Sequence, residues 1–384
     1  MPGETWMKIG VPKEIVQNER RVALTPDAAS KLVRGGIDVI IESQAGSGSF
    51  FRDQAYTEAG AKIVSQAADI YREANVVLKV HPPTTNEVEL MSSGTTLLSL
   101  LQPVTNLEIV SKLAEKSITS FAMDNIPRIA RAQRMDVLSS MSSLAGYKAV
   151  LIAADSLGKY LPMMMTAAGT TAPAQGLILG AGVAGLQAIA TSRRLGAVVE
   201  AFDVRPAVKE QVESLGAKFI EVENTGEAED AGGYARELSK DSQDRQRDLI
   251  HQHVKSADFV ITTALIPGRP APLLITATMV QDMRPGSTIV DLAAEAGGNC
   301  EVTEPGSTIV VNDVTIHGPL NLASEMSIHA SQMYSKNVTN LLEHLSKDGD
   351  IILDFDDDIT NSCCVTHNGE ITHEQTLNLI NETS

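Results

Sequence analysis

The fold of the second half of the chain is decided by one stretch, Gly176-Leu177-Ile178-Leu179-Gly180-Ala181-Gly182-Val183-Ala184-Gly185. Its first four residues suit a short buried strand, and residues 186–195 have the composition of a helix. Three glycines lie between these elements at the spacing G-x-G-x-x-G. A second apolar run, residues 197–202, follows the helix and ends at Asp203. A strand, a glycine-rich turn, a helix and a second strand in this order predict a βαβ unit of a parallel sheet.

The glycine spacing is typical of a turn that binds a dinucleotide. Gly180 permits the tight turn, Gly182 lets the backbone approach a pyrophosphate, and Gly185 allows close helix–strand packing. The helix N-terminus offers N–H groups and the positive end of its dipole to phosphate. Asp203, eighteen residues past Gly185, would accept hydrogen bonds from the adenosine ribose, and its charge favours NAD over NADP. Arg205 leaves NADP open, because an arginine there can accommodate the additional phosphate.

Two later strands should add residues to the same pocket. Residues 259–262 and 288–291 are apolar runs, and each ends in a turn, at 263–268 and at 291–293. Ligands of open α/β sheets bind at the carboxyl ends of strands, so we expect the first of these turns to line the pocket. Asp291 suits a helix cap or a buried hydrogen-bond partner as well as a site residue.

Short apolar runs alternate with helical patterns along most of the chain. The remaining predicted strands are residues 7–11, 38–41, 76–80, 96–100, 118–123, 198–202, 218–222 and 314–317. The helical pattern 27–34 opens with Thr25-Pro26 and closes with Gly35-Gly36, which are start and stop signals in the expected places. This alternation predicts parallel sheets with helices on both faces.

The end of the chain changes character. Residues 321–347 predict one long helix, and residues 351–355, an acidic run at 356–358 and a short tail follow it. We expect the tail to return to the first domain, which gives domains of 1–140 plus 322–384 and of 141–321. The polar segment 223–253 predicts either a solvated loop with a surface helix, or a mobile lid with Gly232-Gly233 as hinge and Tyr234 as the contact.

Composition excludes several classes of protein. The 384 residues carry a net charge of −17, which argues against nucleic-acid binding. The three cysteines show no metal-ligand spacing, so we expect a reducing compartment and neither a zinc site nor a catalytic thiol. The first eight residues do not read as a signal peptide. Residues 161–192 lack charge but are broken by prolines and glycines, so we expect no membrane span.

Several motifs carry a resemblance to known families. The chain opens with Ile-Gly-Val-Pro-Lys-Glu at 9–14 and Arg-Arg-Val-Ala-Leu-Thr-Pro at 20–26, and later contains the glycine turn and Arg-Pro-Gly-Ser at 284–287. With these motifs it resembles alanine dehydrogenases and, more closely, the NAD(H)-binding component of proton-translocating NAD(P) transhydrogenase. The segments typical of the transhydrogenase side are residues 127–140, 163–170, 231–234, 295–300 and 354–357.

The resemblance implies two Rossmann-like, doubly wound α/β domains with a nucleotide cleft between them. It implies a homodimer that lies peripherally on the cytoplasmic or matrix-like face of a membrane, with separate membrane-spanning subunits and a separate component that binds NADP(H). The enzyme would be Re/Si-specific and active only with these partners. The candidate catalytic residues, which would hold the dihydronicotinamide, are Arg128, Gln133, Asp136 and Ser139. The candidate NAD(H)-binding residues are Gly180, Gly182, Val183, Gly185, Asp203, Val204, Arg205, Gly233, Tyr234, Ala264 and Leu265.

Departures from the alanine dehydrogenase pattern favour the transhydrogenase. The substrate-binding lysine of that family is His81 here, and its catalytic histidine falls near Gln102, whereas Arg21 matches its carboxylate-binding arginine. General acid–base catalysis contributes about 10² to 10⁴ in rate, so losing such groups would be severe. Two alternatives stay open: an NAD-dependent amino-acid dehydrogenase that uses Arg21, Lys79 and His81, and a non-catalytic NAD sensor.

Overall fold

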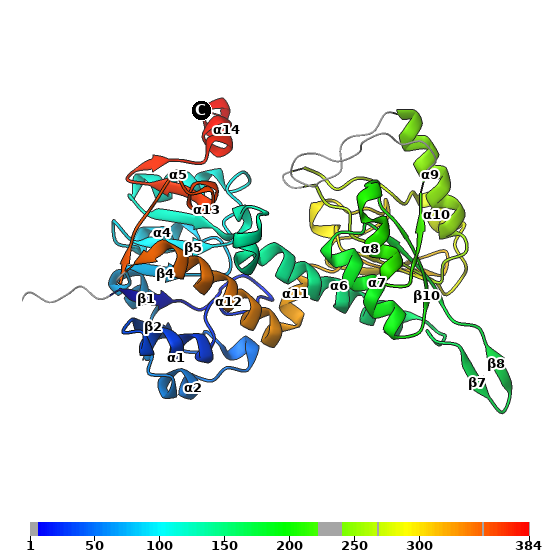
Figure 1. The fold of residues 1–384 in the computed structure, drawn as a ribbon, viewed down its shortest axis with the longest axis horizontal. Coiled ribbons are helices and arrows are strands. Elements are labelled where there is room, and N and C mark those ends of the chain that lie inside the picture. The colour runs from blue at the N-terminus through cyan, green and yellow to red at the C-terminus, as the bar shows by residue number, and fades with distance from the viewer. Residues whose placement is uncertain (1–6, 222–239, 267–268, 348, 384) are drawn as a thin grey trace, which may run out of the picture. The chain divides into compact units, whose positions relative to one another are not determined.

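The structure is a computed structural model that describes residues 7–221, 240–266, 269–347 and 349–383. It divides into two compact units (Figure 1). The first contains Met1–Met141 and Ser324–Ser384, and the second contains Ser142–Ala323. Helix α6 (Val137–Ser156) begins in the first unit and continues in the second.

The first unit contains an eight-stranded sheet in the order β19-β18-β6-β5-β4-β1-β2-β3. Its strands are β1 (Lys8–Val11), β2 (Asp38–Glu42), β3 (Lys62–Val64), β4 (Val76–Leu78), β5 (Thr96–Ser99), β6 (Thr119–Ala122), β18 (Cys364–His367) and β19 (Glu370–Ile371). β1 to β6 are parallel, in the doubly wound order with its switch point between β1 and β4. The last two strands are antiparallel, and β18 pairs with β6. The C-terminal segment therefore returns to the first sheet.

Helices cover this sheet because its short apolar strands are buried on both sides. The helices are α1 (Pro26–Arg34), α2 (Asp53–Glu58), α3 (Ala67–Glu73), α4 (Thr85–Leu90), α5 (Leu107–Glu115), α12 (Ser327–Leu345), α13 (Asp358–Cys363) and α14 (Glu374–Thr383). Buried side chains of α3, α4 and α5 share one apolar cluster with β2, β4 and β5. α1 packs against β2 and α12 (Figure 1).

The second unit contains a seven-stranded sheet in the order β11-β10-β9-β12-β13-β15-β14. Its strands are β9 (Gln175–Leu179), β10 (Val198–Phe202), β11 (Lys218–Ile220), β12 (Phe259–Thr262), β13 (Thr288–Asp291), β14 (Thr308–Val311) and β15 (Val314–His317). All neighbours are parallel except β14 and β15. The switch point lies between β9 and β12, and that is where a doubly wound sheet binds its ligand.

Alternating strand residues bury two separate cores in the second unit. Ile178 and Ile261 belong to a cluster with α6, α7 (Val183–Arg194) and α8 (Lys209–Ser214). Leu177 and Val260 belong to the opposite cluster with α9 (Lys240–Val254) and α10 (Ala277–Gln281). Helices on both faces confirm the predicted doubly wound class, and the antiparallel strands make both sheets mixed.

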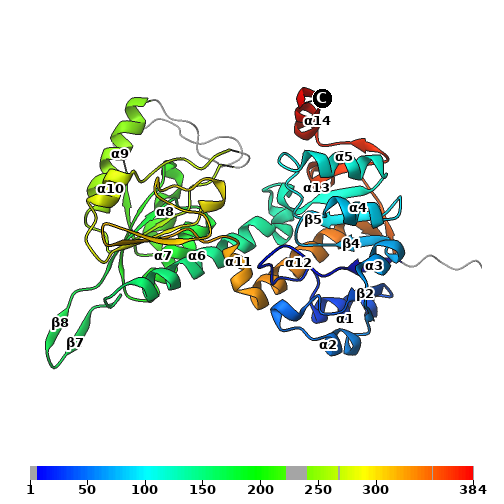
Figure 2. The same cartoon turned by 180° about the vertical axis from the view of Figure 1, so that it is seen from behind.

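Two expectations about local structure are wrong. The single helix predicted over 321–347 is two helices, α11 (Leu322–Glu325) and α12, separated at Met326. The uncharged stretch after residue 161 contains a hairpin of β7 (Met164–Thr166) and β8 (Gly169–Thr171), which the sequence did not predict. The hairpin extends away from the rest of its unit, and Figure 2 shows it from behind. A second short hairpin joins β16 (Ser346–Lys347) to β17 (Asp350–Ile351).

One described helix, α6, is long and apolar enough to cross a membrane by length and composition alone. Its packing is that of a core helix, because Ala149, Val150 and Ala153 are buried in the second unit. A Cβ at Gly146 would lie 2.1 Å from the carbonyl oxygen of Ala184, so the helix also lies close against the start of α7.

Candidate functional site

The glycine turn after β9 has the backbone that a dinucleotide site requires. Gly180 has φ 101°, a left-handed conformation that favours glycine, and a Cβ there would lie 2.5 Å from Thr263 Oγ1. A Cβ at Gly185 would lie 1.9 Å from the Gly180 carbonyl oxygen, so this glycine lets helix and strand meet. By contrast, no described atom lies within 4 Å of a Cβ at Gly182. The protein's own packing explains the first two glycines but not Gly182, which fits the approach of a pyrophosphate.

Helix α7 starts directly at this turn. Gly182 is its N-cap, and the helix runs for 12 residues with Arg193 and Arg194 in its last turn and no acidic residue in its first. An N-terminus without a carboxylate keeps its N–H groups and positive dipole end available to an anion. Val183 is 43% exposed beside it.

Asp203 lies at the end of β10, next to the turn. Its carboxylate accepts a hydrogen bond from the Ala181 N–H at 2.7 Å. It also accepts hydrogen bonds from both the Nε and the Nη2 of Arg205, each at 2.9 Å. The arginine that could accommodate a ribose phosphate is thus held by the carboxylate that would bind a ribose hydroxyl. Val204 between them packs against the second core of this unit.

The turn after β12 is held by a residue that sequence reasoning missed. Asn299 is fully buried, its Oδ1 accepts the Ala264 N–H at 3.0 Å, and its Nδ2 donates to the carbonyl oxygens of Ala264 and Pro272 at 2.8 Å each. Leu265, next along, is 48% exposed. Asn299 lies in the family-typical segment 295–300, but nothing in its spacing indicated which residue it would contact.

Asp291 is a buried structural partner. Its carboxylate accepts hydrogen bonds from the Thr262 hydroxyl at 2.8 Å, the Thr303 hydroxyl at 2.7 Å and the Asn299 N–H at 2.8 Å. It therefore ties β12 and β13 to the loop that carries Asn299.

The four candidate catalytic residues lie on one segment of the first unit. Arg128 and Gln133 are exposed, and the segment is anchored by Ala132 and Met135, which are buried in the 3₁₀ turn η3 (Ala130–Met135).

The other two candidates, Asp136 and Ser139, bond to one another. The Asp136 carboxylate accepts the Ser139 N–H at 2.8 Å and the Ser139 hydroxyl at 2.6 Å, which caps α6. The structure thus gives this pair a helix-capping role and leaves Arg128 and Gln133 facing outward.

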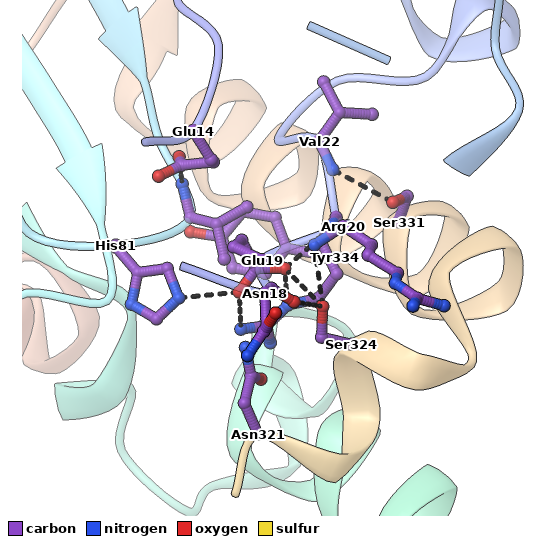
Figure 3. A network of polar contacts seen from close by, with 12 residues as sticks. Glu14, Asn18, Glu19, Arg20, Val22, His81, Asn321, Ser324, Ser331 and Tyr334 are labelled. Atoms are coloured by element: carbon purple, nitrogen blue, oxygen red, sulfur yellow. Dashed lines mark hydrogen bonds and ion pairs between the residues drawn. The ribbon is translucent and has the colours of Figure 1, made fainter. Parts of the chain in front are cut away.

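His81 is paired with a buried carboxylate (Figure 3). Its Nε2 lies 2.6 Å from Glu19 Oε2, and the Glu19 side chain is fully buried. Arg21 donates to the same carboxylate through Nε at 2.9 Å and Nη2 at 2.7 Å. Burial alone would raise the pKa of Glu19, but the hydrogen bonds from Arg21 and His81 hold it well below its usual range. Ser324 adds a hydrogen bond to Glu19 at 2.9 Å.

Lys79 is buried and neutralised by two carboxylates. Its Nζ lies 2.8 Å from Glu87 Oε1 and 3.6 Å from Glu14 Oε2. Burial would lower the pKa of Lys79, but the two carboxylates raise it above its usual value. Tyr334 of α12 closes the cluster by donating to the Lys79 carbonyl oxygen at 2.5 Å.

The remaining predicted features divide as follows. Gly233 and Tyr234, with most of the predicted lid, lie outside the described residues. Within the described ranges no group of three or more His, Cys, Asp or Glu side chains could hold a metal ion. The three cysteines are buried, and burial raises the pKa of Cys300 and of Cys364 to about 11.

Comparison with known proteins agrees with this geometry. The family model "Alanine dehydrogenase/PNT, N-terminal domain" matches residues 10–145, and "Alanine dehydrogenase/PNT, C-terminal domain" matches residues 149–374. An NAD(P) transhydrogenase subunit alpha of Rhodospirillum rubrum is 48% identical over 376 residues, covering 96% of this chain and 98% of that protein.

Two solved structures share the fold. A transhydrogenase from Sinorhizobium meliloti superposes with a TM-score of 0.87 at 46% identity, over 95% of this chain and 99% of that chain. An L-alanine dehydrogenase superposes with a TM-score of 0.83 at 28% identity, over 98% of this chain and 100% of that chain. The chain therefore belongs to the alanine dehydrogenase/PNT family, and it is a homologue of the NAD(P) transhydrogenase alpha subunits.

Proposed function

We propose that the chain is the NAD(H)-binding component of a proton-translocating transhydrogenase. It would deliver hydride from NADH to NADP⁺ held on a partner component, while separate membrane subunits move the protons. The observation that carries the proposal is the glycine turn, in which Gly182 is open although Gly180 and Gly185 are enclosed by protein. Its relatives named transhydrogenase alpha subunits support the reaction class.

The residues present fit this chemistry. When bound, NADH would supply the hydride, and no proton leaves the reacting carbons. The protein must therefore bind, orient and exclude competing acceptors rather than provide an acid and a base. The exposed Arg128 and Gln133 would orient the nicotinamide carboxamide and leave one ring face accessible to the partner.

The second unit would bind the rest of the nucleotide. Backbone N–H groups at the start of α7 would receive the pyrophosphate, and Asp203 would accept the ribose hydroxyls. Asn299 would keep the Ala264 peptide in place at the carboxyl end of β12, beside that turn.

The dehydrogenase alternative loses support from the structure. An amino-acid substrate needs a cation for its carboxylate and a base for its amine. Arg21 directs two nitrogens at Glu19, His81 shares that carboxylate, and Lys79 is buried between acidic groups. Each candidate group already has a partner within the protein.

We further propose that the chain works as a homodimer on the cytoplasmic or matrix-like face of its membrane. The β7–β8 hairpin supports a protein partner, since every residue of both strands is exposed and Met165 is 79% exposed. An isolated two-stranded hairpin is at best marginally stable in water, so a second copy of the chain would stabilise it. A Met165→Glu variant should shift the mass measured by light scattering from dimer to monomer, and an unchanged mass would contradict this interface.

The functional alternatives separate in one steady-state experiment. The purified chain is incubated with NAD⁺ and a panel of amino acids, and separately with NADH, an NADP⁺ analogue and the NADP-binding component of a related transhydrogenase. We expect no NADH formation from any amino acid, and reduced analogue only when the partner is present. NADH formation with one amino acid would establish the dehydrogenase instead, and NADH binding without transfer to the partner would leave the sensor.

A further inference from the structure

The segment η3, which carries Gln133, is fastened to helix α12 of the same unit. The side-chain amides of Asn337 and Asn340 both donate to the carbonyl oxygen of Arg134, at 2.8 and 3.1 Å. Two amides on successive turns of a helix thus hold the backbone directly after Gln133.

The same segment is also fastened to the acidic tail. Arg131 donates through Nη1 to Asp357 Oδ1, and its Nη2 lies 3.4 Å from Asp358 Oδ2. Arg131 is half-exposed, whereas the Asp357 side chain is only 12% exposed. The acidic partner is therefore the fixed one, and the arginine reaches to it.

Asp357 is fixed because it has several further partners. Its Oδ2 accepts the N–H groups of Ile359 and Thr360 at 3.0 and 2.9 Å and so caps α13, and His344 of α12 lies 2.9 Å from the same oxygen. Burial would raise the pKa of Asp357, but these donors and Arg131 hold it well below its usual range. One ionised carboxylate thus joins η3, α12 and α13.

We infer that Arg131 and Asp357 are positioning residues for hydride transfer, which hold η3 so that Gln133 and Arg128 keep the orientation the nicotinamide requires. Arg131 acts through Asp357 and touches neither the nucleotide nor the partner component. The inference rests on the proposed function, because that function places the nicotinamide against this segment. It gives the acidic tail 354–357 a role in catalysis, although the tail lies more than 200 residues along the chain from Gln133.

Two variants remove the ion pair without removing the helix cap. Asparagine caps helices about as well as aspartate, so Asp357→Asn keeps the cap of α13 and loses the charge. Arg131→Gln removes the other partner. The matched control is Arg72→Gln, because Arg72 pairs with Asp69 at 2.6 Å on the surface of the same unit, on helix α3 rather than on η3. Arg131→Lys keeps the charge and serves as the conservative variant.

Three readouts distinguish positioning from general destabilisation. We expect amide exchange of residues 130–136 to be faster in Arg131→Gln and Asp357→Asn than in the wild type or in Arg72→Gln. Hydride transfer to the partner should fall about fivefold in both, with the NADH dissociation constant within about twofold and the melting temperature within about 2 °C. The double variant should be no slower than either single variant, and Arg131→Lys should recover most of the rate.

Unchanged exchange and unchanged transfer in both variants would overturn the inference, as would fully additive losses, because these would show that the residues act separately. A fall in melting temperature that matches the loss of rate would also overturn it, since the pair would then be merely structural. The exchange readout needs no partner. A wild-type chain that transfers no hydride would therefore refute the proposed function, while the exchange data would still test the clamp.

Discussion

Gly182→Ala separates nucleotide binding from folding more cleanly than any other change in the turn. No described atom lies within 4 Å of the added methyl group, and Gly182 has φ −74°, which alanine adopts without strain. Alanine is a poorer N-cap than glycine, but it also lowers the entropy of the unfolded chain by an opposing amount of up to about 1 kcal/mol. We therefore expect a change in melting temperature of no more than about 4 °C.

The effect on binding should be large. The methyl group would occupy the position that the pyrophosphate needs for hydrogen bonds to the N-terminus of α7. Each charge-assisted hydrogen bond is worth about 1.5–3 kcal/mol, so losing one or two would raise the NADH dissociation constant about 10- to 1,000-fold.

The assay is titration calorimetry with NADH, alongside thermal unfolding of the same protein. Gly185→Ala is the contrasting variant, because its Cβ would lie 1.9 Å from the Gly180 carbonyl oxygen and the backbone must shift. It should lose stability and binding together. A Gly182→Ala variant that binds NADH as tightly as the wild type would refute the assignment of this turn to the pyrophosphate.

Three further changes test other parts of the structure. Asp203→Asn removes the partner of Arg205, so the ratio of NADPH to NADH affinity should rise at least about tenfold in fluorescence titrations, and an unchanged ratio would contradict the selectivity argument. The buried thiols should not react with Ellman's reagent until the protein unfolds, and rapid labelling of the native chain would contradict their burial. Because the pKa of Glu19 is lowered in the fold, its stabilisation is present above its ordinary value of 4.5 and is lost as the pH falls below that value. Denaturant titrations should show this loss, and Glu19→Gln should make it shallower.

Local pattern predicted the fold better than it predicted side-chain partners. The strand–turn–helix around Gly180 was predictable because each step has its own local signal. The antiparallel strands β14, β18 and β19 were not, since pairing direction depends on distant segments. No glycine or proline marks the break at Met326, so the helix boundary there had no signal in the sequence.

The candidate site shows the same limit. The spacing predicted that Asp203 and Arg205 would lie near the ribose, but not that they would bond to each other. Asp136 was predicted to contact the nicotinamide, and the structure shows it capping α6 through Ser139. Asn299 had no signal, because its three hydrogen bonds reach loops about 27 and 35 residues away. Contacts of this kind depend on tertiary packing, which residue spacing does not encode.

The most direct test of the central claim is a single-turnover measurement by stopped-flow absorbance. The chain loaded with NADH is mixed with an isolated NADP-binding transhydrogenase component that carries an NADP⁺ analogue whose reduced form absorbs at a distinct wavelength. The proposed function predicts a fast burst of reduced analogue that requires both proteins. No burst from a chain that demonstrably binds NADH would contradict direct hydride transfer.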